Sequence, residues 1–480
     1  MNMSMSMSGR KRACAAAFTM GVALGLAGTS AHSQSFSCKG TPPSAAAAST
    51  SPRTLDGDWV GPLVLGPIHT WAQFRISGDH VAAATGLGAL LDDGGHAVFD
   101  GTNGHLDLGE HGTLDGPVDF HNNLWAAHWV LKDAPDQTLQ LVRRPQTPIP
   151  PLPYRSEDVI FHGADGTAIA GTITAPATPG PHPAVILLTG SQPADRDYVA
   201  FKAPPAHRPF AVLADRLTRQ GFVVLRYDAR SVGGSGGSFI NDPEIQFEGD
   251  IVAGLALLRG RADIDPKKVG LIGHSAGGVL AGRVAAADPS VAFVVLLDSP
   301  GMPAERFATA QIEALGKAEG VSDAELARRV KVSEALNAAV LAASDPADAK
   351  VKVAAAVEAL KRAGLYRNTG PYDLNTAMAP SDYYRFFLTH DPAVDLHQVR
   401  QPVLVIAGTK DLLTPPDTQL PPIRAALKDN RQVDVCVIPG LSHQLRPATT
   451  GTFEEAEASM VTIDETALDS IVSWLALHTR

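Results

Sequence analysis

Six uninterrupted apolar runs constrain the fold of this chain more than any other feature of its sequence. They are AVILLTG, FVVLRYD, VGLIG, VAFVVLLD, PVLVIAG and VDVCVIP, which follow one another between residues 184 and 439. Strands that lack polar alternation are typical of sheets buried on both faces. The segments between the runs, such as PFAVLADRLTRQ and GDIVAGLALLRGR, have the apolar period of helices. The alternation predicts an α/β fold with a mostly parallel, doubly wound sheet.

The chain ahead of these runs has a different pattern. Between residues 55 and 145, short stretches such as WAQFRIS and LWAAHWVL alternate with turn clusters such as DGTNG. This pattern predicts a small antiparallel β domain, either a barrel or a sandwich. The prolines of RRPQTPIPPLPYR predict a stiff linker over residues 146–154. The α/β domain then occupies residues 155–480.

One segment of the α/β domain interrupts the alternation. From about residue 300 to residue 385 there is no strand run, only helical patterns such as DAELARRVKVSEALNAAVLAA. We expect a helical insertion that forms a lid over a ligand crevice at the carboxyl ends of the strands. An insertion without a functional role is the alternative.

The N-terminus has the parts of a signal peptide. A basic SGRKR precedes an apolar stretch that is closed by the small residues around Ala31 and Ser33. This stretch is broken by Gly, Thr and Ser and is shorter than the ~20 residues that span a bilayer, which disfavours a membrane anchor. We therefore expect residues 1–33 to be a cleaved signal peptide and the protein to be periplasmic or secreted, with no membrane span in the mature chain. The Ser, Ala and Pro content of residues 34–54 predicts a flexible leader.

Charge, histidine spacing and cysteine content narrow the possible partners. The formal net charge of −10 gives no basic footprint for nucleic acid. No HxxxH or HExxH pattern occurs among the histidines of the β domain, so we expect no metal. We expect no cofactor either. Two cysteines remain after the predicted cleavage, Cys38 and Cys436. Because Cys436 lies in an apolar run, a buried free thiol is favoured over a disulfide.

The third apolar run ends in a candidate nucleophile. GHSAG fits the GxSxG pattern of a nucleophile elbow and places Ser275 between two glycines. Glycines leave room for a tight strand-to-helix turn, and the small residues of GGVLAGRVAAA predict a helix that packs close beneath it. A serine that serves only the turn is the alternative.

A serine nucleophile needs a base and a group that orients the base. His443 follows the last apolar run in VCVIPGLSHQL, and Asp411 follows the run before it in VLVIAGTKDLLTPP. The order Ser275, Asp411, His443 is the order of α/β-hydrolase triads. Asp417 lies on the same loop as Asp411 and is the alternative acid, but it is farther from the strand end.

The tetrahedral intermediate also needs hydrogen-bond donors for its oxyanion. One candidate is the backbone N–H of Ala276, the residue after the nucleophile. The second should come from the loop after AVILLTG, where Ser191 is preferred and Gly190 is the alternative.

Several motifs taken in order resemble those of bacterial α/β hydrolases related to serine aminopeptidases and dienelactone hydrolases. The motifs are PAVILLTGSQPADRD, PFAVLADRLTRQGFVVLRYDAR, VGLIGHSAGG, VAFVVLLDSPG, PVLVIAGTKDLLTPP and IPGLSH. The chain most resembles secreted or periplasmic carboxylesterases that carry a small N-terminal β domain. The resemblance covers about residues 154–480 and implies an α/β-hydrolase fold. The site residues that it implies are a triad of Ser275, Asp411 and His443, with Ser191 and Ala276 as oxyanion donors.

Two positions depart from the pattern of these relatives. Ala276 stands where an acidic residue is usual, and Ser231 stands where the DDRGxGxS loop has a glycine. Both departures concern the acyl pocket more than the triad, so we expect the mechanism to transfer better than the substrate preference.

The sequence therefore predicts a serine hydrolase that cleaves small carboxylic esters, of short to medium acyl chain, through an acyl-enzyme. The alternatives are an aminopeptidase-like serine peptidase and a binding protein on an inactive hydrolase fold. Asp228, Arg230 and the ADRD stretch at residues 194–197 could contact substrate, but structural ion pairs are favoured for them.

Overall fold

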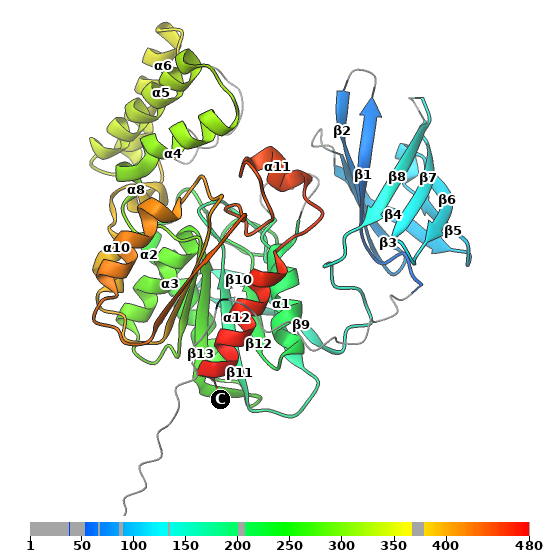
Figure 1. Ribbon diagram of the computed structural model, residues 1–480, viewed down its shortest axis with the longest axis horizontal. Coiled ribbons are helices and arrows are strands. Elements are labelled where there is room, and N and C mark those ends of the chain that lie inside the picture. The colour runs from blue at the N-terminus through cyan, green and yellow to red at the C-terminus, as the bar shows by residue number, and fades with distance from the viewer. Residues whose placement is uncertain are drawn as a thin grey trace, which may run out of the picture. The chain divides into compact units, whose positions relative to one another are not determined.

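The structure contains two kinds of sheet. The alternating stretches between residues 55 and 145 form one of them, and the continuous apolar runs form most of the other. It is a computed structural model, and it describes Cys38 and residues 53–65, 68–85, 90–132, 135–199, 207–366 and 379–479. The predicted signal peptide and most of the predicted leader lie outside these ranges. Within them the chain forms a closed antiparallel barrel and an eight-stranded mixed sheet flanked by helices (Figure 1). The predicted fold class is confirmed.

The β domain is a barrel of eight strands. Alternating burial produces it: β7 exposes and buries successive residues, and the buried set includes Trp125. The Trp125 ring packs edge to face against Trp59 at a centroid distance of 5.5 Å. The sequence did not decide between a barrel and a sandwich. The structure shows a barrel, because the first strand pairs with the last. The strands are β1 (Gly57–Leu65), β2 (Ile68–Ser77), β3 (His80–Thr85), β4 (Leu90–Phe99), β5 (Asn103–Asp107), β6 (Thr113–Asp119), β7 (Leu124–Val130) and β8 (Gln137–Arg143).

The second sheet sets the position of the candidate site. Its strand order is β16-β15-β14-β13-β11-β12-β10-β9, and the strands from β16 to β12 in that order are parallel. Their carboxyl ends therefore meet at one edge of the sheet. The strands are β9 (Tyr154–His162), β10 (Ala168–Pro176), β11 (His182–Leu188), β12 (Val223–Tyr227), β13 (Ile264–His274), β14 (Val294–Leu297), β15 (Val403–Gly408) and β16 (Val433–Ile438).

Helices cover both faces of this sheet. Helices α1 and α12 pack together on one face, and α2 and α3 pack together on the other (Figure 1). No helix in the described part of the chain is long and apolar enough to cross a membrane. The helices of this domain outside the insertion are α1 (Pro209–Arg219), α2 (Glu244–Arg259), α3 (Ala276–Ala287), α9 (Pro392–Leu396), α10 (Pro416–Ala426), α11 (Phe453–Ala458) and α12 (Glu465–His478).

Between β14 and β15 the described residues form helices and no strand. Side chains of Ser322, Asp345 and Ser381 cap the N-termini of three of them. These helices share an apolar cluster of their own, which includes Val332 and Val353. The helices of this insertion are α4 (Ala304–Ala318), α5 (Asp323–Leu341), α6 (Pro346–Arg362) and α8 (Asp382–Thr389).

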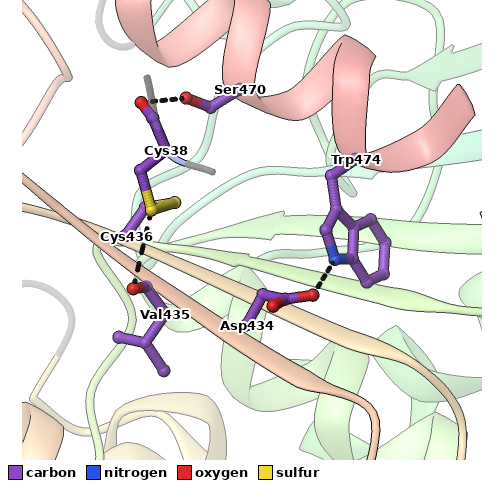
Figure 2. Close-up of a disulfide and its surroundings, with 6 residues drawn as sticks. All are labelled: Cys38, Asp434, Val435, Cys436, Ser470 and Trp474. Carbon is purple, nitrogen blue, oxygen red and sulfur yellow. Dashed lines mark hydrogen bonds between the residues drawn. A yellow bond between two sulfur atoms is a disulfide. The ribbon is translucent and has the colours of Figure 1, made fainter. Parts of the chain in front are cut away.

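The expectation of a free thiol at Cys436 is wrong. Figure 2 shows Cys38 in a disulfide with Cys436, which is fully buried in the edge strand β16. The two Cα atoms are 5.6 Å apart, within the usual disulfide range. Ser470 of α12 also donates a hydrogen bond to the carbonyl oxygen of Cys38. The composition around Cys38 contains no apolar period, so nothing in the sequence indicated that it would reach this strand.

Replacing Cys38 with serine is expected to lower the free energy of unfolding by about 2 to 4 kcal/mol, because the disulfide restricts the unfolded chain. Urea unfolding without reductant measures this loss. The matched test is a double variant, Cys38→Ser with Cys436→Ser, which should be no less stable than Cys436→Ser alone. Additive losses in the two single variants would show that the cysteines do not act as a pair.

Candidate active site

Ser275 lies at a sharp turn between the end of β13 and the start of α3. Its φ of 54° and ψ of −126° are strained for a residue with a side chain, and the turn places it at the carboxyl edge of the sheet. The backbone N–H of Ser275 donates to the carbonyl oxygen of Leu297 on the neighbouring strand, at 2.8 Å. The strand and the helix therefore hold Ser275 in the conformation of a nucleophile elbow.

The two glycines of the elbow are required by close backbone contacts. A Cβ on Gly273 would overlap the carbonyl oxygen of Gly277. A Cβ on Gly277 would overlap the carbonyl oxygens of Leu188 and Thr189 at the end of β11. The sequence pattern thus reflects the packing of β13 against the start of α3 and of α3 against the end of β11.

His443 and Asp411 meet at the same edge of the sheet. His443 Nδ1 lies 2.9 Å from Asp411 Oδ2, and both residues are buried, at 7% and 2% exposure. Asp411 also accepts hydrogen bonds from the backbone N–H groups of Leu413 and Thr414. Burial alone would raise the pKa of Asp411, but the charge of His443 and these hydrogen bonds hold it below the usual range. An ionised carboxylate here stabilises a protonated His443 and fixes the proton on Nδ1 in the neutral ring.

The alternative acid is not part of this arrangement. Asp417 is exposed in the first turn of α10. The described hydrogen bonds of His443 run to Asp411, Thr414 and His274, and none of them joins it to the Ser275 hydroxyl. Catalytic hydrogen bonds of this kind are often loose until substrate binds.

The structure separates the two candidates for the second oxyanion donor. The N–H of Gly190 donates to the hydroxyl of Tyr198 at 2.8 Å, so it is already engaged. Ser191 follows it and is exposed. Ala276 is the first residue of α3, so its N–H has no acceptor within the helix. Ala276 and Ser191 therefore remain the candidates.

A family model described as "alpha/beta hydrolase fold" matches residues 201–444, slightly more than half of the chain. The chain belongs to the α/β-hydrolase family. Esterase EstD of Thermotoga maritima is similar to this α/β hydrolase, with 24% identity over 328 residues that cover 68% of this chain and 69% of the esterase.

Solved structures of other hydrolases resemble this α/β hydrolase at lower similarity. The esterase Pf2001 of Pyrococcus furiosus has 17% identity and a TM-score of 0.38, over 60% of this chain and 83% of its own. The α/β hydrolase GrgF of Penicillium sp. has 16% identity and a TM-score of 0.43, over 68% of this chain and 99% of its own.

The polar loops of this α/β hydrolase are held by ion pairs. Arg196 binds both carboxylate oxygens of Asp228 through Nε and Nη2. Arg230 binds Asp250 in the same way, and its side chain is fully buried. Asp228 and Arg230 thus have structural pairs, as favoured from the sequence, although not with each other. Among the described residues no cluster of three or more histidine, cysteine or acidic side chains could hold a metal.

Ser231 replaces the glycine of the related loop pattern in a position that suits glycine. Its φ is 60°, and its hydroxyl accepts a hydrogen bond from the N–H of Phe239 at 3.2 Å. The loop keeps its left-handed turn despite the side chain.

Sequence reasoning missed a second carboxyl group close to Asp411. Asp298 follows β14 and is only 1% exposed. Its Oδ1 accepts a hydrogen bond from the backbone N–H of Gly408, at 2.8 Å. Its Oδ2 has no hydrogen-bond partner among the described residues. Burial, and then the charge of Asp411, raise the pKa of Asp298 well above its usual range, which keeps this group neutral. Its position at the end of the run VAFVVLLD is the signal that could have found it.

Asp298→Asn is expected to become stabilising relative to the wild type as the pH rises. Because the pKa is raised in the native state, the native protein retains a proton that the unfolded chain releases above an ordinary carboxyl pKa. The wild type therefore loses up to about 1.4 kcal/mol of unfolding free energy for each pH unit in this range, and the asparagine variant does not. Urea unfolding at pH 4, 5.5 and 7 measures the difference, with Asp417→Asn as the exposed control. A difference that does not change with pH would contradict a neutral Asp298.

Proposed function

We propose that this protein is an exported serine carboxylesterase that hydrolyses small esters through an acyl-enzyme on Ser275. Its class, a hydrolase of the carboxylesterase type, rests on the family match and on the esterase relative. The observation that carries the mechanism is the buried hydrogen bond between Asp411 and His443, on the loops that follow β15 and β16. Ser275 follows β13 of the same parallel sheet, so all three residues share one edge.

In the proposed reaction, His443 Nε2 takes the proton of the Ser275 hydroxyl as Oγ attacks the acyl carbon. The backbone N–H groups of Ala276 and Ser191 hold the oxyanion that forms on the carbonyl oxygen. When the ester C–O bond breaks, His443 returns the proton to the departing alkoxide, which leaves as the alcohol. Water then attacks the acyl carbon with His443 as the base. The bond between this carbon and Ser275 Oγ breaks, His443 returns the proton to Oγ, and the carboxylic acid is released. Asp411 stabilises the protonated ring in both halves of the reaction.

The carboxylates in and near the loop after β11, which carries Ser191, favour an ester substrate over a peptide with a free N-terminus. Such a peptide needs a free acid for its ammonium group. Asp195 Oδ1 instead accepts hydrogen bonds from two backbone N–H groups of its own loop. Asp197 forms ion pairs with Arg208 and Arg226. Asp228 is paired with Arg196.

A panel of chromogenic substrates tests the proposed class of substrate. We expect turnover of p-nitrophenyl acetate, butyrate and octanoate with a maximum at short to medium chain length. Aminoacyl p-nitroanilides should react at least about 100-fold more slowly in kcat/KM, because the carboxylates of Asp195, Asp197 and Asp228 are already engaged and cannot pair freely with an ammonium group. Faster cleavage of the anilides would indicate the aminopeptidase-like alternative. No turnover of either series by folded protein would favour a binding role.

The export part of the proposal is supported by the disulfide between Cys38 and Cys436, because such bonds persist in oxidising compartments. We expect the mature protein to begin at Gln34 and to fractionate with the periplasm or the medium. Intact mass of the purified protein from a secreting host, with and without reduction, measures both cleavage and the disulfide. An uncleaved, reduced protein in the cytoplasm would contradict export.

A further inference from the structure

The residue before the nucleophile is a histidine that the proposed mechanism does not use. His274 is buried, at 7% exposure, and both of its ring nitrogens are within hydrogen-bond distance of a partner. Its Nε2 lies 2.6 Å from the carbonyl oxygen of His443. A carbonyl oxygen can only accept, so the proton of the ring is on Nε2. Burial, and then the charge of His443, lower the pKa of His274 to about 3, so the ring is neutral and Nδ1 is an acceptor.

The partner of His274 Nδ1 is the hydroxyl of Tyr198, at 2.9 Å. Since Nδ1 accepts, the Tyr198 hydroxyl donates to it. Burial raises the pKa of Tyr198 above its usual range, so this hydroxyl keeps its proton. The Tyr198 oxygen in turn accepts from the backbone N–H of Gly190, at 2.8 Å. Tyr198 takes a φ of 64° to reach this place, and its ring packs on Phe210 at 4.8 Å.

These contacts form one series of hydrogen bonds, each with a single possible direction. The series begins at the backbone of the loop after β11 and ends at the backbone of the loop after β16, which carries His443. Between these loops it passes directly beside the nucleophile, because His274 adjoins Ser275 in sequence and a Cβ on Gly190 would lie 3.3 Å from the Ser275 Cβ. The two loops carry the proposed oxyanion donor and the proposed base.

Gly190 is held on its other side as well. Its carbonyl oxygen lies 3.5 Å from the hydroxyl of Tyr383, which comes from the insertion helix α8. In a planar peptide the next N–H points away from this carbonyl. Tyr383 therefore holds the peptide that contains the N–H of Ser191, and Tyr198 holds the peptide before it.

We propose that Tyr198 and His274 are positioning residues. They fix the loop after β11, which carries Ser191, and the loop after β16, which carries His443, in their positions relative to Ser275. This inference rests on the proposed esterase function. Neither residue exchanges a proton with substrate. Each acts through a backbone group, Tyr198 on Gly190 and His274 on His443. Loss of these hydrogen bonds should leave substrate binding nearly unchanged and weaken the stabilisation of the tetrahedral intermediate.

Tyr198→Phe tests the first link, because it keeps the ring and removes only the hydroxyl. We expect kcat for p-nitrophenyl butyrate, normalised to active sites titrated with a fluorophosphonate, to fall about 10- to 100-fold with KM changed less than about threefold. The Ki of a phenylboronic acid, which forms a tetrahedral adduct with serine, should rise by a similar factor. Tyr154→Phe is the matched control, since it removes a hydroxyl that binds Asp215 outside the site. An unchanged kcat and Ki in Tyr198→Phe would overturn the proposal.

A pair of variants at His274 tests the second link. The amide of His274→Gln offers a donor nitrogen and an acceptor oxygen, as the neutral ring offers one donor and one acceptor nitrogen, so we expect it to keep kcat within about tenfold. His274→Leu offers neither and should lose about 100-fold or more in kcat per titrated site. Equal kcat in the two variants would overturn the hydrogen-bonding role. A loss of more than about 10,000-fold in His274→Gln would make His274 a proton-transfer group instead. Activity retained in Ser275→Ala would overturn the esterase mechanism itself, which separates that failure from failure of the positioning role.

Discussion

Ser275→Ala is expected to lower kcat for p-nitrophenyl butyrate by at least about 10,000-fold, because no other described group occupies the elbow. The substitution removes Oγ and with it the acyl-enzyme. We expect the fold to survive, because the described hydrogen bonds of Ser275 are made by its backbone and remain in the alanine variant. Initial rates together with thermal unfolding measure both parts.

A matched control for this variant is Ser290→Ala, which removes an exposed hydroxyl in the loop after α3. It should keep the wild-type rate within about twofold, as most exposed substitutions do. Comparable rates in Ser275→Ala and Ser290→Ala would contradict the nucleophile assignment.

Asp411→Asn has the second largest expected effect, a loss of about 1,000- to 10,000-fold in kcat. The carboxylate accepts a hydrogen bond from the Nδ1–H of His443, with 2.9 Å between Nδ1 and Oδ2. An amide can instead donate to Nδ1, which moves the ring proton to Nε2 and leaves no base facing Ser275. Steady-state rates from pH 6 to pH 9 measure the loss. We expect it to persist across this range, because a tautomer change is not reversed by pH.

Asp417→Asn is the matched control for the triad acid, because Asp417 lies on the same loop and is exposed. Its rate should stay within about twofold of the wild type. Loss of activity in Asp417→Asn with retention in Asp411→Asn would reverse the assignment of the acid.

The strands that build the site could be predicted because they have continuous apolar runs, which are buried on both faces in the central strands and only partly buried in the edge strand β16. The runs that became β11 to β16 are almost wholly apolar, and each prediction depends only on local composition. The first two strands of the same sheet were missed. β9 lies at the sheet edge and is largely exposed, while β10 is rich in Ala, Thr and Gly, so neither has an apolar run.

Residues that depend on a distant partner could not be predicted. Cys38 and Cys436 are 398 residues apart, and no local pattern links them. Tyr198 and His274 act through hydrogen bonds to backbone groups of other loops, which leave no trace in residue spacing. Asp298 is defined by its burial beside Asp411 rather than by a motif.

Covalent labelling with a fluorophosphonate, read by mass spectrometry, tests the central claim most directly. The account predicts one phosphonyl adduct per wild-type chain, on the peptide that contains Ser275. Ser275→Ala should give none, and His443→Ala should label at least about 100-fold more slowly, because the hydroxyl has lost its base. An adduct on another residue, or unreactive wild-type protein that is folded by circular dichroism, would contradict the account.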